Sequence, residues 1–103
     1  SVVISGAHKL SLEAVEEWTL KQPGVVSAAA VSAPHPKFGE SFVCFVTLAD
    51  GTNFDASKAH FTLGVVAKSG QWKAIDALPT LMSGKPDLIE LTEQAKTLGG
   101  NLG

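Results

Sequence analysis

The chain has 103 residues, of which 45% are hydrophobic and 17% are charged, and its formal net charge is −2. These numbers predict one small soluble globular domain with a thin apolar core. The sequence has no basic patch, no apolar run near the ~20 residues of a membrane span and no signal peptide, which argues against nucleic-acid binding and membrane spanning.

The N-terminal quarter of the chain predicts a hairpin followed by a helix. Residues 2–10 read as two short extended pieces around Gly6, a pattern typical of a β-hairpin. Ser11 is a good N-cap for a helix over residues 12–22, which Pro23-Gly24 would end. Three side chains at helical spacing are expected to face the core: Leu12, Val15 and Trp18.

The next quarter predicts two strands joined by a loop. Residues 25–33 are small and β-branched, and residues 34–40 contain two prolines and a glycine, as a loop would. Residues 41–49 are apolar at both odd and even positions. A strand with two apolar faces is typically covered on both sides, so we expect this strand to be central.

The third quarter predicts a turn, a helix and a short strand. Asp50-Gly51 is a turn signal, and Asp55 is expected to cap a helix over residues 56–67. Three side chains of this helix are expected to point inward: Ala59, Leu63 and Val66. Ser69-Gly70 would end the helix, and residues 71–78 read as a short strand.

The last quarter predicts a loop and a terminal helix. Pro86 is expected at the first helical position. Leu88, Leu91 and Ala95 mark the apolar face of the helix, and Gly99-Gly100 would end it. The whole order predicts an α+β fold: a small mixed sheet with an N-terminal hairpin and two to three packed helices.

Metal and nucleophile chemistry find little support in the sequence. His8, His35 and His60 are far apart and lack the paired spacing of zinc ligands. Cys44, the single cysteine, lies in the most apolar strand, where cysteine behaves as a small hydrophobe. It excludes an internal disulfide and fits a reducing cytoplasm, which is the localisation we expect. Trp18 and Trp72 are expected in the core.

One lysine, in the segment LPTLMSGKPD of residues 78–87, is a candidate for chemistry. Lys85 follows a flexible Ser83-Gly84 joint, and a lysine is a good point charge for phosphate or carboxylate. The segment is not a P-loop, because Pro79 and Pro86 occupy positions where that motif needs Gly and Ser or Thr. The residues alone leave the role open, since a loop lysine is more often merely solvated.

Three segments, in order, resemble the C-terminal domain of adenylate-forming acyl- and aryl-CoA synthetases. Residues 4–25 resemble the opening segment of that domain, with a Ser5-Gly6 turn, Val15-Glu16 and Gln22 to Val25 in the matching places. Residues 31–40, VSAPHPKFGE, resemble the family's VPHPxWGE loop. Residues 78–87 resemble its closing LPxTxSGK motif.

The resemblance implies that residues 1–103 are the C-terminal lid of an AMP-forming acid–thiol ligase whose large N-terminal domain is absent from this chain. Such enzymes make an acyl-adenylate from a carboxylic acid and ATP, and then pass the acyl group to the thiol of coenzyme A. The expected partners are therefore the enzyme's own N-terminal domain and a small carboxylic acid. Mg²⁺ is expected in the full-length enzyme, bound outside this domain, and the fragment is not expected to be active alone.

The resemblance also assigns site residues. Lys85 is implied to be the catalytic lysine of adenylate formation. Ser5, Gly6 and Ala7 are implied to line the pantetheine tunnel in the thioester-forming step, with Ala7 in place of the family's second glycine. The loop around Lys37 and Phe38 would lie near the nucleotide part of coenzyme A.

Three short segments bear on the identity of the acid. Together with ISG at residues 4–6 and SLEAVE at residues 11–16, the variant SGKPD at residues 83–87 looks most like o-succinylbenzoate–CoA ligases of menaquinone biosynthesis in some bacteria. Open alternatives are a fatty-acid or other aryl-acid CoA ligase, a carrier-protein-loading adenylation domain, or a non-catalytic binding module of the same fold.

Overall fold

The computed structural model describes residues 1–100 and contains five strands, three α-helices and one 3₁₀ helix within that range. In chain order these are β1 (Val2–Ser5), β2 (His8–Ser11), α1 (Leu12–Leu20), β3 (Val25–His35), β4 (Gly39–Leu48), α2 (Ala59–Leu63), the 3₁₀ helix η1 (Val65–Lys68), β5 (Gln71–Ala74) and α3 (Leu88–Gly100). The predicted α+β class is confirmed. Within residues 1–100, no helix is both long and apolar enough to cross a membrane.

The strands form two sheets. β1 and β2 pair antiparallel as the predicted hairpin, with Ser5 opposite His8. The second sheet has the order β3-β4-β5, in which β4 pairs antiparallel with β3 and parallel with β5. The larger sheet is therefore mixed, as predicted, and β4 is its central strand.

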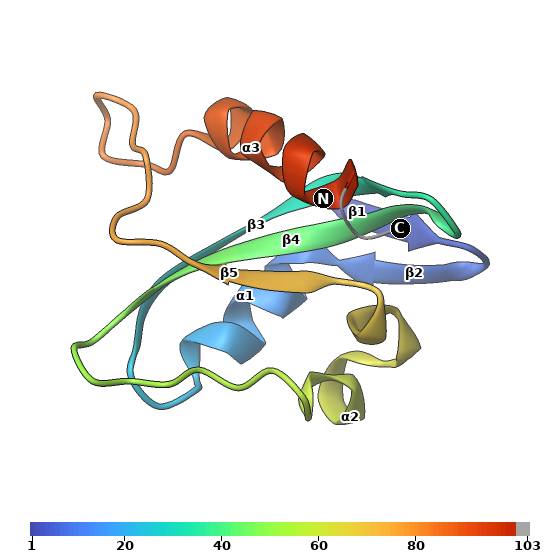
Figure 1. Cartoon of the computed structure of the whole chain (residues 1–103), viewed down its shortest axis with the longest axis horizontal. Coiled ribbons are helices and arrows are strands. Elements are labelled where there is room, and N and C mark those ends of the chain that lie inside the picture. Colours follow the sequence, from blue (N-terminus) through green and yellow to red (C-terminus); the bar gives the residue numbers. More distant parts are fainter. Residues whose placement is uncertain (101–103) are drawn as a thin grey trace.

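Helices cover both faces of the three-stranded sheet (Figure 1). On one face, α1 and the hairpin pack against Phe42, Cys44 and Val46 of β4. On the other face, α3 packs against Val43 and Phe45. All five of these side chains are buried, so the prediction of a central strand with two apolar faces is confirmed.

Helix α1 begins as predicted. The Ser11 hydroxyl accepts a hydrogen bond from Ala14 N at 3.2 Å, which satisfies one of the free N–H groups at the helix start. Leu12 and Val15 are buried, and Trp18 is half-buried in contact with other aromatic rings. Thr19 is also buried, although its residue type gave no sign of this.

The predicted loop at residues 34–40 is wrong in extent. β3 continues to His35 and β4 begins at Gly39, so only three residues form the turn. Pro34 is accommodated because β3 is an edge strand, with a neighbouring strand on one side only. Proline has no N–H to donate, and it is tolerated in edge strands for this reason.

The predicted helix over residues 56–67 is also wrong. Gly64 has φ +87°, outside the helical region, and separates α2 from η1. The Asp55 carboxylate accepts hydrogen bonds from Ser57 N and Oγ, which closes a local turn and does not cap α2. The three side chains predicted to point inward do so: Ala59 and Val66 are buried, and Leu63 packs against the core.

The start of the last helix differs from the prediction. Pro86 pairs with Thr80 in an isolated β-bridge, and α3 begins at Leu88. The Asp87 carboxylate accepts a hydrogen bond from Glu90 N at 3.1 Å, as an N-cap does. Leu91 and Ala95 are buried as predicted, but Leu88 is 52% exposed. The last residue of α3 is Gly100, at the pair of glycines expected to end it.

Candidate functional site

Lys85 lies on a loop that is closed by backbone hydrogen bonds. Asp87 N donates to Pro79 O at 2.8 Å, Leu81 N donates to Lys85 O at 2.8 Å, and Gly84 N donates to Leu81 O at 2.9 Å. Gly84 has φ +90°, a conformation that favours glycine. The Ser83-Gly84 pair, predicted to be a flexible joint, is thus part of the turn of a small hydrogen-bonded loop.

The Lys85 side chain is exposed to solvent and accessible from outside the domain. It takes part in neither of the ion pairs among residues 1–100. Next to it, Met82 is fully exposed and Leu81 is half exposed. The loop borders an open pocket of about 480 Å³, which we call the Lys85 pocket. It is lined by Glu16, Ala28, Leu81, Lys85, Pro86, Asp87, Leu88 and Ile89.

The turn between β1 and β2 forms the second candidate region. Gly6 has φ +60°, and its N–H donates to Phe38 O at 3.0 Å. The Ser5 hydroxyl lies 3.3 Å from the Ser69 hydroxyl, at the end of η1. The Ser5-Gly6-Ala7 turn is therefore attached to two other segments, the β3–β4 turn and η1.

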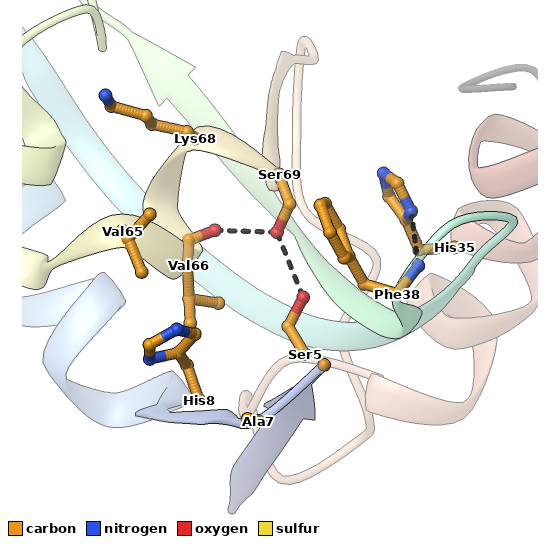
Figure 2. A pocket seen from close by; sticks show the side chains of 10 residues that line it. Ser5, Ala7, His8, His35, Phe38, Val65, Val66, Lys68 and Ser69 are labelled. Atoms are coloured by element: carbon orange, nitrogen blue, oxygen red, sulfur yellow. Dashed lines mark hydrogen bonds between the residues drawn. The ribbon is translucent and has the colours of Figure 1, made fainter.

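These three segments enclose a second hollow of about 530 Å³, the hairpin pocket (Figure 2). It is lined by Ser5, Gly6, Ala7, His8, His35, Phe38, Val65, Val66, Lys68 and Ser69. Apolar lining with a few polar groups is typical of a small-molecule site.

An aromatic pair borders the hairpin pocket. The rings of His35 and Phe38 stack with their centres 4.9 Å apart, and Lys37 Nζ lies 5.3 Å from the centre of the Phe38 ring. His35 Nδ1 accepts hydrogen bonds from Lys37 N at 3.1 Å and Phe38 N at 3.2 Å. Nδ1 is therefore the ring nitrogen that faces the backbone of this turn. His35 thus stabilises the turn that presents Phe38.

The structure does not bring all the predicted site residues together. Ser5, Gly6, Ala7 and Phe38 line the hairpin pocket, whereas Lys85 lines its own pocket. The β1–β2 turn and the loop that precedes α3 lie toward opposite ends of the long axis of the molecule (Figure 1). The domain therefore carries two separate candidate sites.

The sequence missed the part of the hairpin pocket that η1 provides. Val65, Lys68 and Ser69 fell within or beside a helix that was predicted to run unbroken to residue 67. The one signal for a break was Gly64, and glycine within a helical pattern is only weak evidence of an end.

Cys44 is not activated as a nucleophile, and the histidines belong to no metal-binding group among residues 1–100. Burial raises the pKa of the Cys44 thiol to about 12, so it is not a nucleophile at neutral pH. Among residues 1–100, no group of three or more His, Cys, Asp or Glu side chains is arranged to hold a metal ion.

Comparison with known proteins agrees with this fold. Residues 14–85 match the family model of the AMP-binding enzyme C-terminal domain. The chain is 31% identical over 98 residues to sulfoacetate–CoA ligase of Cupriavidus necator, covering 91% of this chain and 19% of that protein. It is 32% identical over 104 residues to the peroxisomal trans-cinnamate:CoA ligase of Petunia hybrida, covering 95% of this chain and 18% of that protein.

A solved structure shows the same likeness. ATP-bound MatB from Rhodopseudomonas palustris superposes with a TM-score of 0.84 at 25% identity, over 95% of this chain and 20% of that chain. The present chain thus spans about a fifth of the length of the proteins it matches. The family match covers well over half of its residues, and the chain belongs to the AMP-binding enzyme C-terminal domain family of adenylate-forming acyl-CoA synthetases.

Proposed function

We propose that this chain is the mobile C-terminal lid of an ATP-dependent acid–CoA ligase, which forms an acyl-adenylate and then a thioester with coenzyme A. The observation that carries the proposal is the separation of Lys85 from the Ser5-Gly6-Ala7 turn within a domain of this family. Two half-reactions need two sets of groups. A lid that rotates between them can present each of its two sites in turn to one active centre.

In this proposal Lys85 serves adenylate formation. Attack of a carboxylate on the α-phosphate of ATP brings anionic groups together, and a cation between them stabilises the transition state. Lys85 suits this role because it is exposed, on a closed loop, and in neither ion pair among residues 1–100. Loss of one such contact typically costs ~10²–10³ in rate.

The Ser5-Gly6-Ala7 turn serves thioester formation. Gly6 has no Cβ, so a thin chain such as pantetheine can pass close to its backbone. Ala7 adds a methyl group to this path, where the family resemblance expects glycine. The Phe38 ring, with Lys37 and Lys68 nearby, offers an aromatic surface and positive charge to the adenine nucleotide of coenzyme A.

We propose that the substrate is an aryl acid. The SGKPD variant at residues 83–87 resembles o-succinylbenzoate–CoA ligases, which favours an aryl acid and a place in menaquinone biosynthesis. The relatives, however, include ligases named for sulfoacetate and for trans-cinnamate at nearly equal identity. This is expected if the large domain, and not the lid, holds the acid.

The remaining requirements belong to the longer protein. Among residues 1–100, no group of three or more His, Cys, Asp or Glu side chains could hold Mg²⁺, which in this proposal binds with ATP at the large domain. The unpaired thiol of Cys44 is in keeping with work in a reducing cytoplasm.

The test is pyrophosphate release by the full-length protein with ATP, Mg²⁺ and a panel of carboxylic acids that includes o-succinylbenzoate, cinnamate, acetate and a long-chain fatty acid. The proposal expects release that depends on one acid class, followed by thioester when coenzyme A is added. Absence of acid-dependent release with every acid would favour a non-catalytic module. Adenylate without transfer to coenzyme A would favour a carrier-protein thiol.

A further inference from the structure

We propose that Glu40 is a positioning residue for the thioester-forming step, because its carboxylate fixes the Ser5-Gly6-Ala7 turn against the β3–β4 hairpin. This inference rests on the function proposed above. Glu40 lies near the start of β4, directly after the turn that carries Phe38. It does not line the hairpin pocket, so any effect on a ligand there would be indirect.

One carboxylate bridges two segments of the chain. Glu40 Oε1 accepts a hydrogen bond from Ile4 N at 2.7 Å, and Glu40 Oε2 accepts one from the Ser32 hydroxyl at 3.1 Å. Hydrogen bonds to an ionised acceptor are stronger than bonds between neutral groups. Glu40 therefore ties the backbone of β1 to β3, two elements that belong to different sheets.

The position of Ile4 explains why this tie controls the turn. Ile4 lies in β1, and Gly6 comes directly after the last residue of that strand, Ser5. Gly6 N donates to Phe38 O, and Ile4 N donates to Glu40. These two hydrogen bonds attach the C-terminal end of β1 and the residue after it to the β3–β4 hairpin. Without Glu40, the bond from Gly6 N to Phe38 O would be the only one left of these two.

A second tie secures the other side of the same turn. Ser69 Oγ donates to Val66 O at 2.7 Å, so its single proton is used and it accepts from Ser5 Oγ at 3.3 Å and Ser41 Oγ at 2.7 Å (Figure 2 shows the Ser5 contact). Ser5 and Ser41 are both buried. Because Glu40 and Ser69 hold the turn from two sides, the β1–β2 and β3–β4 turns form one rigid wall of the hairpin pocket.

The experiment compares Glu40→Ala with Glu40→Gln in the full-length protein. Glutamine keeps both contacts, since its amide oxygen accepts from Ile4 N and its amide NH₂ donates to Ser32 Oγ. Two rates are measured: acid-dependent ATP–pyrophosphate exchange, and single-turnover thioester formation from preformed acyl-adenylate across a range of coenzyme A concentrations. Thermal melting confirms that each variant is folded at the assay temperature.

The inference expects kcat/KM for coenzyme A to fall about 10- to 100-fold in Glu40→Ala, as misplacement of a positioning group by about 1 Å does. Pyrophosphate exchange should stay within about twofold of wild type, and Glu40→Gln should recover most of the loss. Equal loss in both half-reactions, or no loss in either, overturns the inference. If Glu40→Ala does not fold, Ser32→Ala, which removes one of the two contacts of the Glu40 carboxylate, must show a selective loss in the same direction. A wild-type protein with no exchange for any acid would instead overturn the proposed function.

Discussion

The indole N–H of Trp72 donates a hydrogen bond to the hydroxyl of Thr19 at 2.9 Å, and so joins β5 to α1 across the core. The same hydroxyl donates to Val15 O at 2.7 Å. Thr19 is completely buried, so its oxygen has no access to water. A polar side chain is tolerated at this position because each of its hydrogen-bonding functions is used.

Thr19→Val should therefore destabilise the domain by about 1–3 kcal/mol, because it has nearly the same shape but leaves the Trp72 N–H without an acceptor. Thr19→Ser is the matched control, since it keeps the hydroxyl and removes one methyl group. Urea unfolding of the isolated domain, followed by tryptophan fluorescence, measures both. A valine variant as stable as wild type would show that the Trp72 bond contributes nothing.

Gly70 lies where no side chain fits. A Cβ at this position would overlap the buried ring of Phe42, closer than any real contact between such atoms. Gly70→Ala should cost about 1–3 kcal/mol of stability or more, the usual range for overpacking a core. Truncating the ring removes the clash, so Gly70→Ala combined with Phe42→Leu should cost clearly less than the sum of the single changes. Simple additivity would contradict the close packing of Gly70 against the Phe42 ring.

Glu16 predicts a pH dependence of stability. Burial is the main cause that raises the pKa of its carboxyl above the ordinary value of 4.5. The hydrogen bond from Ala30 N at 2.8 Å lowers this pKa, and the nearby charge of Glu13 raises it by a smaller amount. The folded state therefore binds the proton more tightly than the unfolded state. The resulting stabilisation is fully present below pH 4.5 and is lost as pH rises through the folded-state pKa.

Glu16→Gln removes this titration, and its amide oxygen still accepts from Ala30 N. Between about pH 4 and pH 7, the free energy of unfolding of the variant should thus rise relative to that of wild type. Urea titrations at several pH values measure the difference. A constant difference across the range, or a fall with pH, would contradict the direction of the shift.

Cys44 should be inert while the domain is folded. It is fully buried, and its thiol has a pKa raised to about 12, so neither access nor ionisation favours reaction at pH 8. Labelling with a disulfide reagent should be slow in buffer and rapid in concentrated urea, at a rate set by unfolding. Prompt labelling of the native domain would show that β4 is not covered as described.

The sequence predicted best where one residue type decides the local structure. The hairpin around Gly6, the Ser11 cap and the two apolar faces of residues 41–49 all follow from local rules and were confirmed. The resemblance to a known family named Lys85 and Gly6, and their roles remain predictions.

Predictions failed where a competing local contact, or a contact between distant segments, decides the structure. Asp55 is a good helix cap by type, but Ser57 takes up its carboxylate, and Gly64 at positive φ breaks the helix that was expected to follow. Pro86 suits a helix start, yet its bridge to Thr80 closes the Lys85 loop and moves that start to Leu88. The roles of Glu40 and Ser69 depend on contacts with β1, far away in the sequence, and no pattern revealed them.

The most direct test of the central claim is the rate of each half-reaction in full-length Lys85→Ala. We predict that acid-dependent ATP–pyrophosphate exchange falls about 10²- to 10³-fold, while thioester formation from supplied acyl-adenylate is largely spared. Lys96→Ala is the control, since Lys96 makes only an exposed ion pair with Glu93 on α3 and its loss should change neither rate. Equal loss of both half-reactions in Lys85→Ala, or unchanged exchange, would contradict the role given to Lys85.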